Sequence, residues 1–249
     1  HASVARGSGA AAPTDRAFPT RHLILRNVVQ ARFDELVAPL GDVLLDESAA
    51  AAMTASAYLN AQVLRALSHG WLPARPQVQG RRTPLETLPL QALPYNAFEV
   101  LAEAAAHALS LHVGTYLLDQ DAVLLDGDTP DGFATAWLAS TLDAIRLDRD
   151  DPGHRAALLV FNYLAERDAL VRDPATGRYR MDAEAQRVAV PEVVDLLFTA
   201  MRDGAAQTAT VLVEQQTQLA PLLATDLERL DAAEVPVGLV YDQGARVLF

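Results

Sequence analysis

The sequence contains no cysteine, which excludes disulfide bonds, thiolate metal ligands and a thiol nucleophile. It also contains no lysine, so its 20 basic residues are all arginines, against 32 acidic residues. The net charge of -12 argues against nucleic acid and anionic membrane surfaces as partners. No apolar run approaches the roughly 18 residues that a membrane-spanning helix needs. These absences favour a soluble protein, and the expected location is cytoplasmic.

The composition supports a sizeable buried core, because 51% of the 249 residues are apolar. Residues 1–20 are rich in small and polar side chains and are expected to form a flexible lead-in. Residues 21–249 are expected to form a single helical domain.

Apolar residues recur at helical spacing along most of this domain. The predicted helices are 24–37, 46–69, 95–119, 131–147, 154–168, 191–202, 206–218 and 222–230. Pro39 and Gly41 are expected to end the first helix, and five prolines between positions 71 and 94 predict a long irregular connection. Residues 170–181 predict two short strands joined by a turn, and residues 235–249 predict one or two edge strands. The predicted fold is therefore mainly α.

Residues 61–70, AQVLRALSHG, place Arg65 and His69 one turn apart on the same helical face. In the zinc-peptidase pattern H-E-x-x-H, two histidines at this spacing bind the metal, and the glutamate acts as general base on the metal-bound water. Here the five residues read R-A-L-S-H. One histidine of the pair is present, and Ala66 stands where the base would be.

Several stretches in the same order resemble the carboxyl-terminal, catalytic half of the dipeptidyl peptidase III family of zinc metallopeptidases, in particular its bacterial branch. The matching stretches are LILRNVVQARFDELVAPL, VLRALSHG, GRRTPLETL, AEAAAH followed by TYLLD, VFNYLAERDALVRDPATGRYRMD and LERLDAAEVPVGLVY. The resemblance implies a helical metallopeptidase-like lobe with a small β-hairpin and short C-terminal strands. It also implies that the H-E-x-x-H motif of the family is degenerate in this chain.

The second helix of the family's metal site aligns with this chain in two ways. Counting back from TYLLD puts Glu103 at the metal-ligating glutamate and His107 at an aspartate that supports the ligands. Counting forward from Tyr95 puts Glu99 at the first glutamate and Val100 at the ligand. The first alignment is preferred because TYLLD continues the same helix, and it directs Glu103 and His107 towards the first helix.

Three interpretations of the site are open. In the favoured one no metal binds, and Arg65 pairs with Glu103 to supply the positive charge of the missing zinc. In the second, His69, Glu103 and His107 form a three-ligand zinc site with an open fourth position. In the third, these are polar groups that satisfy one another in a cleft.

The resemblance adds further candidates. His154 matches, with a displacement of one residue, a histidine that helps to stabilise the family's transition state. Tyr95, Asn162 and Tyr163 are candidate ligand-binding residues. Without a base at position 66, peptide hydrolysis is expected to fall by roughly a hundredfold to ten-thousandfold, so ordinary peptidase activity is not expected.

The favoured hypothesis is a repurposed, metal-independent protein that binds and transforms a small molecule by acid/base catalysis, in specialised metabolism. Its catalytic residues would be Arg65, His69, Glu103, His107 and His154, with Arg65 binding an anionic or carbonyl oxygen. The alternatives are a non-catalytic pseudopeptidase that binds a ligand or partner protein, and a zinc-dependent hydrolase with unusual ligands. Family members carry a further amino-terminal lobe, so a separate lobe or a second copy of this chain is a possible partner.

Overall fold

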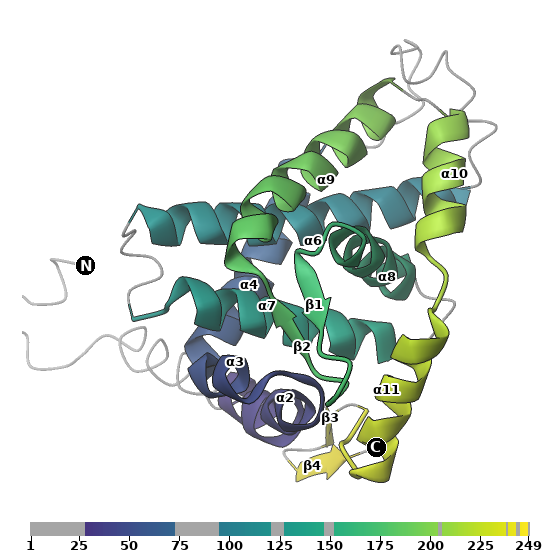
Figure 1. Ribbon diagram of the computed structural model, residues 1–249. Coiled ribbons are helices and arrows are strands. Elements are labelled where there is room, and N and C mark those ends of the chain that lie inside the picture. The colour runs from purple at the N-terminus through teal and green to yellow at the C-terminus, as the bar shows by residue number, and fades with distance from the viewer. Residues whose placement is uncertain are drawn as a thin grey trace, which may run out of the picture.

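The computed structural model describes residues 28–72, 95–120, 127–146, 152–203, 206–237, 239–242 and 245–248. Helices dominate these ranges, and two antiparallel hairpins complete them (Figure 1). In chain order the elements are η1 (Phe33–Val37), α2 (Ala38–Leu44), α3 (Glu47–Ala52), α4 (Ala55–His69), α6 (Tyr95–Asp119), α7 (Pro130–Arg146), α8 (Pro152–Ala165), β1 (Leu170–Arg172), β2 (Tyr179–Met181), α9 (Ala183–Asp203), α10 (Ala206–Gln216), α11 (Pro221–Ala232), β3 (Leu239–Asp242) and β4 (Ala245–Leu248). The predicted fold class is confirmed. No helix within the described ranges is both long and apolar enough to cross a bilayer.

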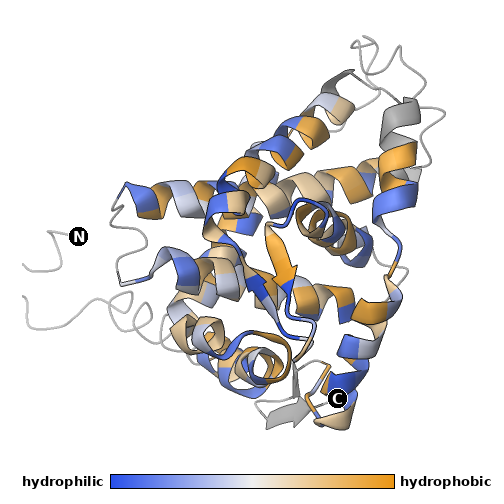
Figure 2. Ribbon diagram, viewed as in Figure 1, coloured by the Kyte–Doolittle hydropathy of each residue, from blue (hydrophilic) through white to orange (hydrophobic). Residues whose placement is uncertain are grey.

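Helix α6 is the centre of the fold. It packs against α4, α7, α8, α9 and α10, and Figure 1 shows it crossing the molecule with α7 on one side and α9 on the other. Its buried residues include Leu101, Ala104, Ala105 and Leu111, all with no exposed surface. The small alanines let neighbouring helices approach closely. In Figure 2, α8 and the middle of α6 are mostly orange or pale, as expected for the interior.

The first predicted helix does not end at Pro39 and Gly41, as the sequence suggested. A π-helical turn, η1, leads directly into α2, which continues to Leu44. Pro39 lies in the first turn of α2, directly after the π-helical turn, where the chain already departs from the regular α-helical hydrogen-bond pattern. The proline is therefore tolerated, and Gly41 is buried inside the helix.

Two other predicted boundaries are wrong. The single helix expected over residues 46–69 is divided at Met53, whose backbone is extended, and Thr54 caps α4 by accepting a hydrogen bond from the N–H of Ala57 at 3.0 Å. Helix α9 begins well before Pro191, because Asp182 accepts hydrogen bonds from two N–H groups of its first turn. The connection over residues 73–94 and the lead-in lie outside the described residues.

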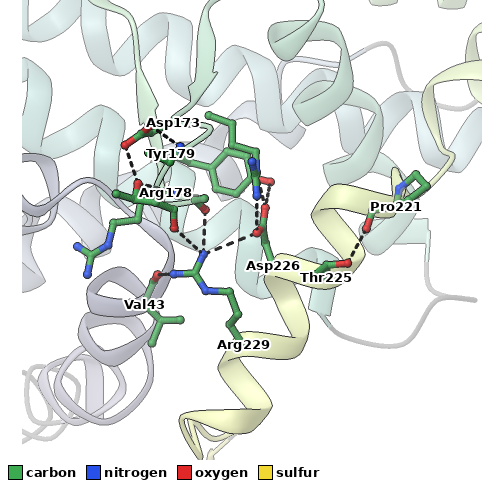
Figure 3. Close-up of polar contacts among 12 residues, drawn as sticks. Val43, Asp173, Arg178, Tyr179, Pro221, Thr225, Asp226 and Arg229 are labelled. Carbon is green, nitrogen blue, oxygen red and sulfur yellow. Dashed lines mark hydrogen bonds and ion pairs between the residues drawn. The ribbon is translucent and has the colours of Figure 1, made fainter.

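The first hairpin is joined to α11 by a buried carboxylate. Asp226, 2% exposed, accepts hydrogen bonds from Nε and Nη2 of Arg172 at 2.6 and 2.8 Å, and from the Tyr179 hydroxyl at 2.7 Å (Figure 3). We call these three residues the Asp226 network. Burial acts to raise the pKa of Asp226, but the hydrogen bonds and positive charge outweigh burial and hold this pKa below its usual value. The carboxylate is therefore ionised in the folded protein near neutral pH.

Arg229 extends this connection to α2. Its guanidinium donates to the backbone oxygens of Val43, Thr176 and Gly177 at 2.8, 3.2 and 3.1 Å. Gly177 has a φ of +67°, a left-handed conformation that favours glycine and closes the hairpin turn. Three segments far apart in sequence, α2, the β1–β2 hairpin and α11, are thus joined by one polar assembly.

Close packing of α6 against α7 gives a first testable prediction. A Cβ atom added at Gly114 would lie 2.1 Å from Cζ of Phe133, which is completely buried. Gly114→Ala should lower the free energy of unfolding by about 1–3 kcal/mol, even though alanine favours helices over glycine by about 1 kcal/mol. Urea denaturation of Gly114→Ala, Phe133→Leu and the double variant measures this. Additive losses in the double variant would contradict the close contact, because the smaller Leu side chain should relieve part of the strain.

Candidate functional site

The predicted site residues on α4 and α6 meet at a partly exposed position. The carboxylate oxygen Oε2 of Glu103 lies 3.5 Å from Nη2 of Arg65 and 3.3 Å from Nε2 of His69. The side chains of Arg65, Glu103 and His69 are 20%, 34% and 38% exposed, so solvent reaches them. We call these residues the Arg65–Glu103–His69 cluster. The contact expected between Arg65 and Glu103 is present.

The sequence of α4 explains why this cluster lies at the edge of the core. Tyr58, Ala61, Leu64 and Ser68 form a buried stripe at helical spacing. Arg65 follows Leu64 of this stripe, and its side chain is partly covered, with 20% of it exposed. The cluster residues of α4 therefore lie at the edge of the core, where solvent reaches them.

Of the two alignments of the second helix, the one that counts back from TYLLD agrees with the structure. It assigns Glu103 to the site, and Glu103 contacts both polar residues of α4. The other alignment assigns Val100 to the ligand position, but Val100 is completely buried in the hydrophobic core. Glu99 lies one turn before Glu103 and is half-buried.

His107 lies behind the cluster, inside the core. It is 1% exposed, its ring packs on Trp137 with centroids 4.7 Å apart, and its Nε2 lies 2.8 Å from Oγ1 of Thr141. The Thr141 hydroxyl donates to the backbone oxygen of Trp137, so Nε2 of His107 is the donor in their contact. Burial, with a smaller effect from the charge of Arg65, holds the pKa of His107 well below its usual value. This histidine is therefore neutral and fixed in place.

The residues of the zinc alternative do not meet at one point in the described ranges. In the ranges that the structure describes, no three His, Asp or Glu side chains are grouped so that they could hold one metal ion. His69 and Glu103 supply two donors, whereas the neighbouring guanidinium of Arg65 repels a cation. Of the two ring nitrogens of His107, Nε2 contacts Thr141, and Nδ1 is buried without a hydrogen-bond partner among the described residues.

The other candidates lie on α8 or at the start of α6. His154 is buried in the first turn of α8, not in solvent. Nδ2 of Asn162 donates to the backbone oxygens of Gln216 and Gln218, so it fixes the end of α10. Tyr163 is buried, and the guanidinium carbon of Arg167 lies 3.5 Å from the centroid of its ring.

Asn162 and Tyr163 thus have structural partners of their own, and their role in ligand binding stays a prediction. Tyr95 begins α6, but its side chain lies outside the described residues.

Sequence reasoning missed a second polar group beside α4. Arg32 donates from Nε to the Tyr58 hydroxyl at 2.8 Å and from Nη2 to Oδ2 of Asp143 at 3.0 Å. Burial raises the pKa of Asp143 despite this guanidinium. The only local signal was Tyr58, which lies two turns before Arg65 on α4. Arg32 and Asp143 are 111 positions apart, so no motif joins them.

Comparisons with known proteins show which folds this chain resembles. No family model matches the sequence. The chain is similar in structure to dipeptidyl peptidase III from Caldithrix abyssi, with a TM-score of 0.74, 22% identity, and coverage of 85% of this chain and 39% of that one. It is also similar to dipeptidyl peptidase III from Corallococcus sp. strain EGB, with a TM-score of 0.73, 24% identity, and coverage of 86% and 38%. The resemblance seen in the sequence is therefore confirmed for the fold.

One sequence relative is Nudix hydrolase 3 from Arabidopsis thaliana. It is 24% identical over 221 residues, which make up 88% of this chain and 28% of the plant protein. The chain thus corresponds to less than half of each of these three proteins.

Proposed function

We propose that the protein binds a small molecule through an anionic or carbonyl oxygen at the Arg65–Glu103–His69 cluster and transforms it by acid/base catalysis without a metal ion. The observation that carries this proposal is the pair of contacts that Glu103 makes with Arg65 and His69. They bring a fixed positive charge, a carboxylate and an imidazole together at an accessible position. The matching stretches of sequence relate these two helices to the zinc helices of dipeptidyl peptidase III, so the proposed function is a repurposed one.

Each side chain has a role in this proposal. Nε2 of His69 faces Glu103, which leaves Nδ1 to accept a proton from the substrate. Glu103 orients the imidazole and stabilises its protonated form, as the acidic partner does in a catalytic triad. Arg65 binds the substrate oxygen and stabilises negative charge that develops there. His107 is proposed to support the site from its buried side, and His154 to act as acid or stabiliser.

The proposed site works without a bound metal ion, and the metal content of the purified protein tests this. The expected result is that protein purified without chelator contains no stoichiometric zinc and binds none in calorimetry, since Arg65 opposes a cation at the cluster. One zinc ion per chain that is lost in Glu103→Ala would instead support the hydrolase with unusual ligands.

The binding step gives a further prediction. Arg65→Gln should weaken the binding of small carboxylic and oxo acids roughly tenfold, because it removes a charge-assisted hydrogen bond. Ligand-observed NMR titration of an acid library measures this. Arg187→Gln, on the exposed surface of α9, is the matched control and should leave binding unchanged. Equal effects of the two variants would overturn the assignment of Arg65.

A second candidate function is a pseudopeptidase that binds a partner protein. Leu59, Val63 and Leu67 of α4 and Trp71, just beyond its end, follow one another at intervals of four residues and are 39–55% exposed. Such an apolar stripe suits a protein partner, including a separate amino-terminal lobe or a second copy of the chain. Light scattering of the purified protein, and mass spectrometry of what co-purifies with it, test this candidate.

A further inference from the structure

The outward face of α4 carries a continuous row of exposed apolar side chains. The row consists of Leu59, Val63, Leu67 and Trp71, which are 39%, 45%, 52% and 55% exposed. We call these four residues the apolar stripe. Other exposed apolar residues of the described chain, such as Tyr116 on α6 and Val188 on α9, lie on separate elements. A contiguous patch of this kind marks an interaction surface, whereas single exposed residues do not.

The apolar stripe faces away from the Arg65–Glu103–His69 cluster. Leu67 lies two residues from Arg65 and two from His69, and two residues correspond to about 200° around an α-helix. The stripe and the cluster are therefore on opposite sides of α4. A partner that covers the stripe leaves the cluster open, so this surface goes beyond the function proposed for the cluster.

Small side chains form a groove beside the apolar stripe. The next row along α4, again at intervals of four residues, contains Gln62, Ala66 and Gly70, and the last two are exposed. Helices pack by fitting the ridge of side chains on one helix into the groove beside a ridge on the other. The face of α4 presents both a ridge of large residues and a groove lined by small ones. It is therefore complementary to itself, as the contact between two identical subunits related by a two-fold axis requires.

The distribution of charge also favours a second copy at this face. The chain has a net charge of -12, so most contacts between two copies would bring like charges together. Positions 48–85, which include all of α4, contain no Asp or Glu. Asp128 contacts α4 from the side, where the amide of Asn60 donates to its carboxylate at 2.6 Å, and Glu103 lies at the cluster. The apolar stripe can therefore meet its own copy without an acidic residue of α4 in the contact.

We propose that two copies of this chain associate through the apolar stripe, each inserting its large side chains beside Ala66 and Gly70 of the other. The expected crossing angle of the two α4 helices is about 50°, the angle at which rows spaced by four residues interdigitate. Four half-exposed side chains supply less than the roughly 800 Å² per partner of a typical stable complex. The dimer is therefore a weak one, with a Kd on the order of micromolar.

Light scattering across a dilution series of the purified chain measures this association. Leu67→Glu should raise the Kd of the dimer at least about tenfold, because a two-fold axis places the new charge in the contact twice. Val188→Glu, at a position 61% exposed on α9, adds the same charge elsewhere and is the matched control. Salt should strengthen the dimer, because it screens the repulsion between two acidic chains without weakening apolar contacts. Circular dichroism shows whether each variant is folded.

A cross-linking experiment identifies the surface directly, because the chain has no cysteine of its own. Val63 lies near the middle of the apolar stripe, and a residue near a two-fold axis lies close to its own copy. Val63→Cys should therefore give a covalent dimer with a short bismaleimide reagent. Val188→Cys should remain monomeric under the same conditions.

Three results would overturn the proposal. The first is a monomer at all concentrations up to about 0.1 mM, which would mean that the stripe is covered within one chain or stays open. The second is a dimer that Leu67→Glu and Val188→Glu weaken equally, or that Val63→Cys does not cross-link, since the contact would then lie elsewhere. The third is recovery of a different chain in equal amount that is lost in Leu67→Glu, which would identify another protein as the occupant.

Discussion

Asp226→Ala is expected to lower the free energy of unfolding by about 3 kcal/mol and the melting temperature by roughly 6–12 °C. The variant removes three hydrogen bonds and leaves the guanidinium of Arg172 and the hydroxyl of Tyr179 without their acceptor. Breaking a buried ion pair costs about 3–5 kcal/mol. We expect the lower end of that range because the side chain of Arg172 is 26% exposed and regains some water.

Chemical denaturation of Asp226→Ala beside Asp231→Ala measures this effect. Asp231 lies on the same helix and forms a 2.7 Å ion pair with Arg146, but its side chain is 70% exposed. Its loss should cost at most about 1 kcal/mol, since exposed ion pairs contribute little. Arg146 also keeps the backbone oxygens of Val235 and Pro236 as acceptors. Equal losses in the two variants would show that the Asp226 network does not join the hairpin to α11.

The same residue contributes to the pH dependence of stability. The pKa of Asp226 is lower in the folded chain than in the unfolded chain, so the unfolded state binds more protons as the pH falls. The contribution of Asp226 is therefore complete above its unfolded pKa of about 3.9 and is lost at lower pH. In Asp226→Ala this part of the acid dependence should be absent.

The elements predicted well were those with strong local signals. The periodicity of residues 95–119 fixed both ends of α6, and the turn residues between two β-prone stretches located the β1–β2 hairpin. Prolines were misleading at Pro39 and Pro191, because a proline in a first turn and one inside a helix look the same in sequence. Asp182 is a residue type that commonly caps helices, so the sequence did contain a signal for the start of α9. This capping residue sets the start of the helix, and the proline nine residues later does not.

The candidate site was only partly predictable for a different reason. Helical spacing placed Arg65 and His69 on one face, and the alignment with the family placed Glu103 beside them. One motif and one alignment were therefore sufficient to predict that these three residues lie together. The Asp226 network and the Arg32 contacts each combine residues from distant segments. Their side chains are common polar types with no spacing to mark them. Only the tertiary structure brings them together.

Catalysis at the Arg65–Glu103–His69 cluster is the prediction that separates an enzyme from a pseudopeptidase. For an oxo acid bound in D2O, His69 should take the proton from the carbon beside the carbonyl group while the electron pair moves to the oxygen held by Arg65. Return of a deuteron to that carbon then labels the ligand. His69→Gln and Glu103→Gln should lower the rate of labelling by roughly a hundredfold to ten-thousandfold, because each removes part of the general base.

Proton NMR of the acids that bind follows this exchange without knowledge of the natural substrate. His112→Gln, on α6 outside the cluster, is the control and should exchange at the wild-type rate. Full exchange in both His69→Gln and Glu103→Gln would remove these residues from the mechanism. A ligand that binds in an Arg65-dependent way but is not labelled by the wild-type protein would instead identify a binding site without chemistry. Arg65 would then be the functional residue of the cluster, and His69 and Glu103 would serve to hold it in place.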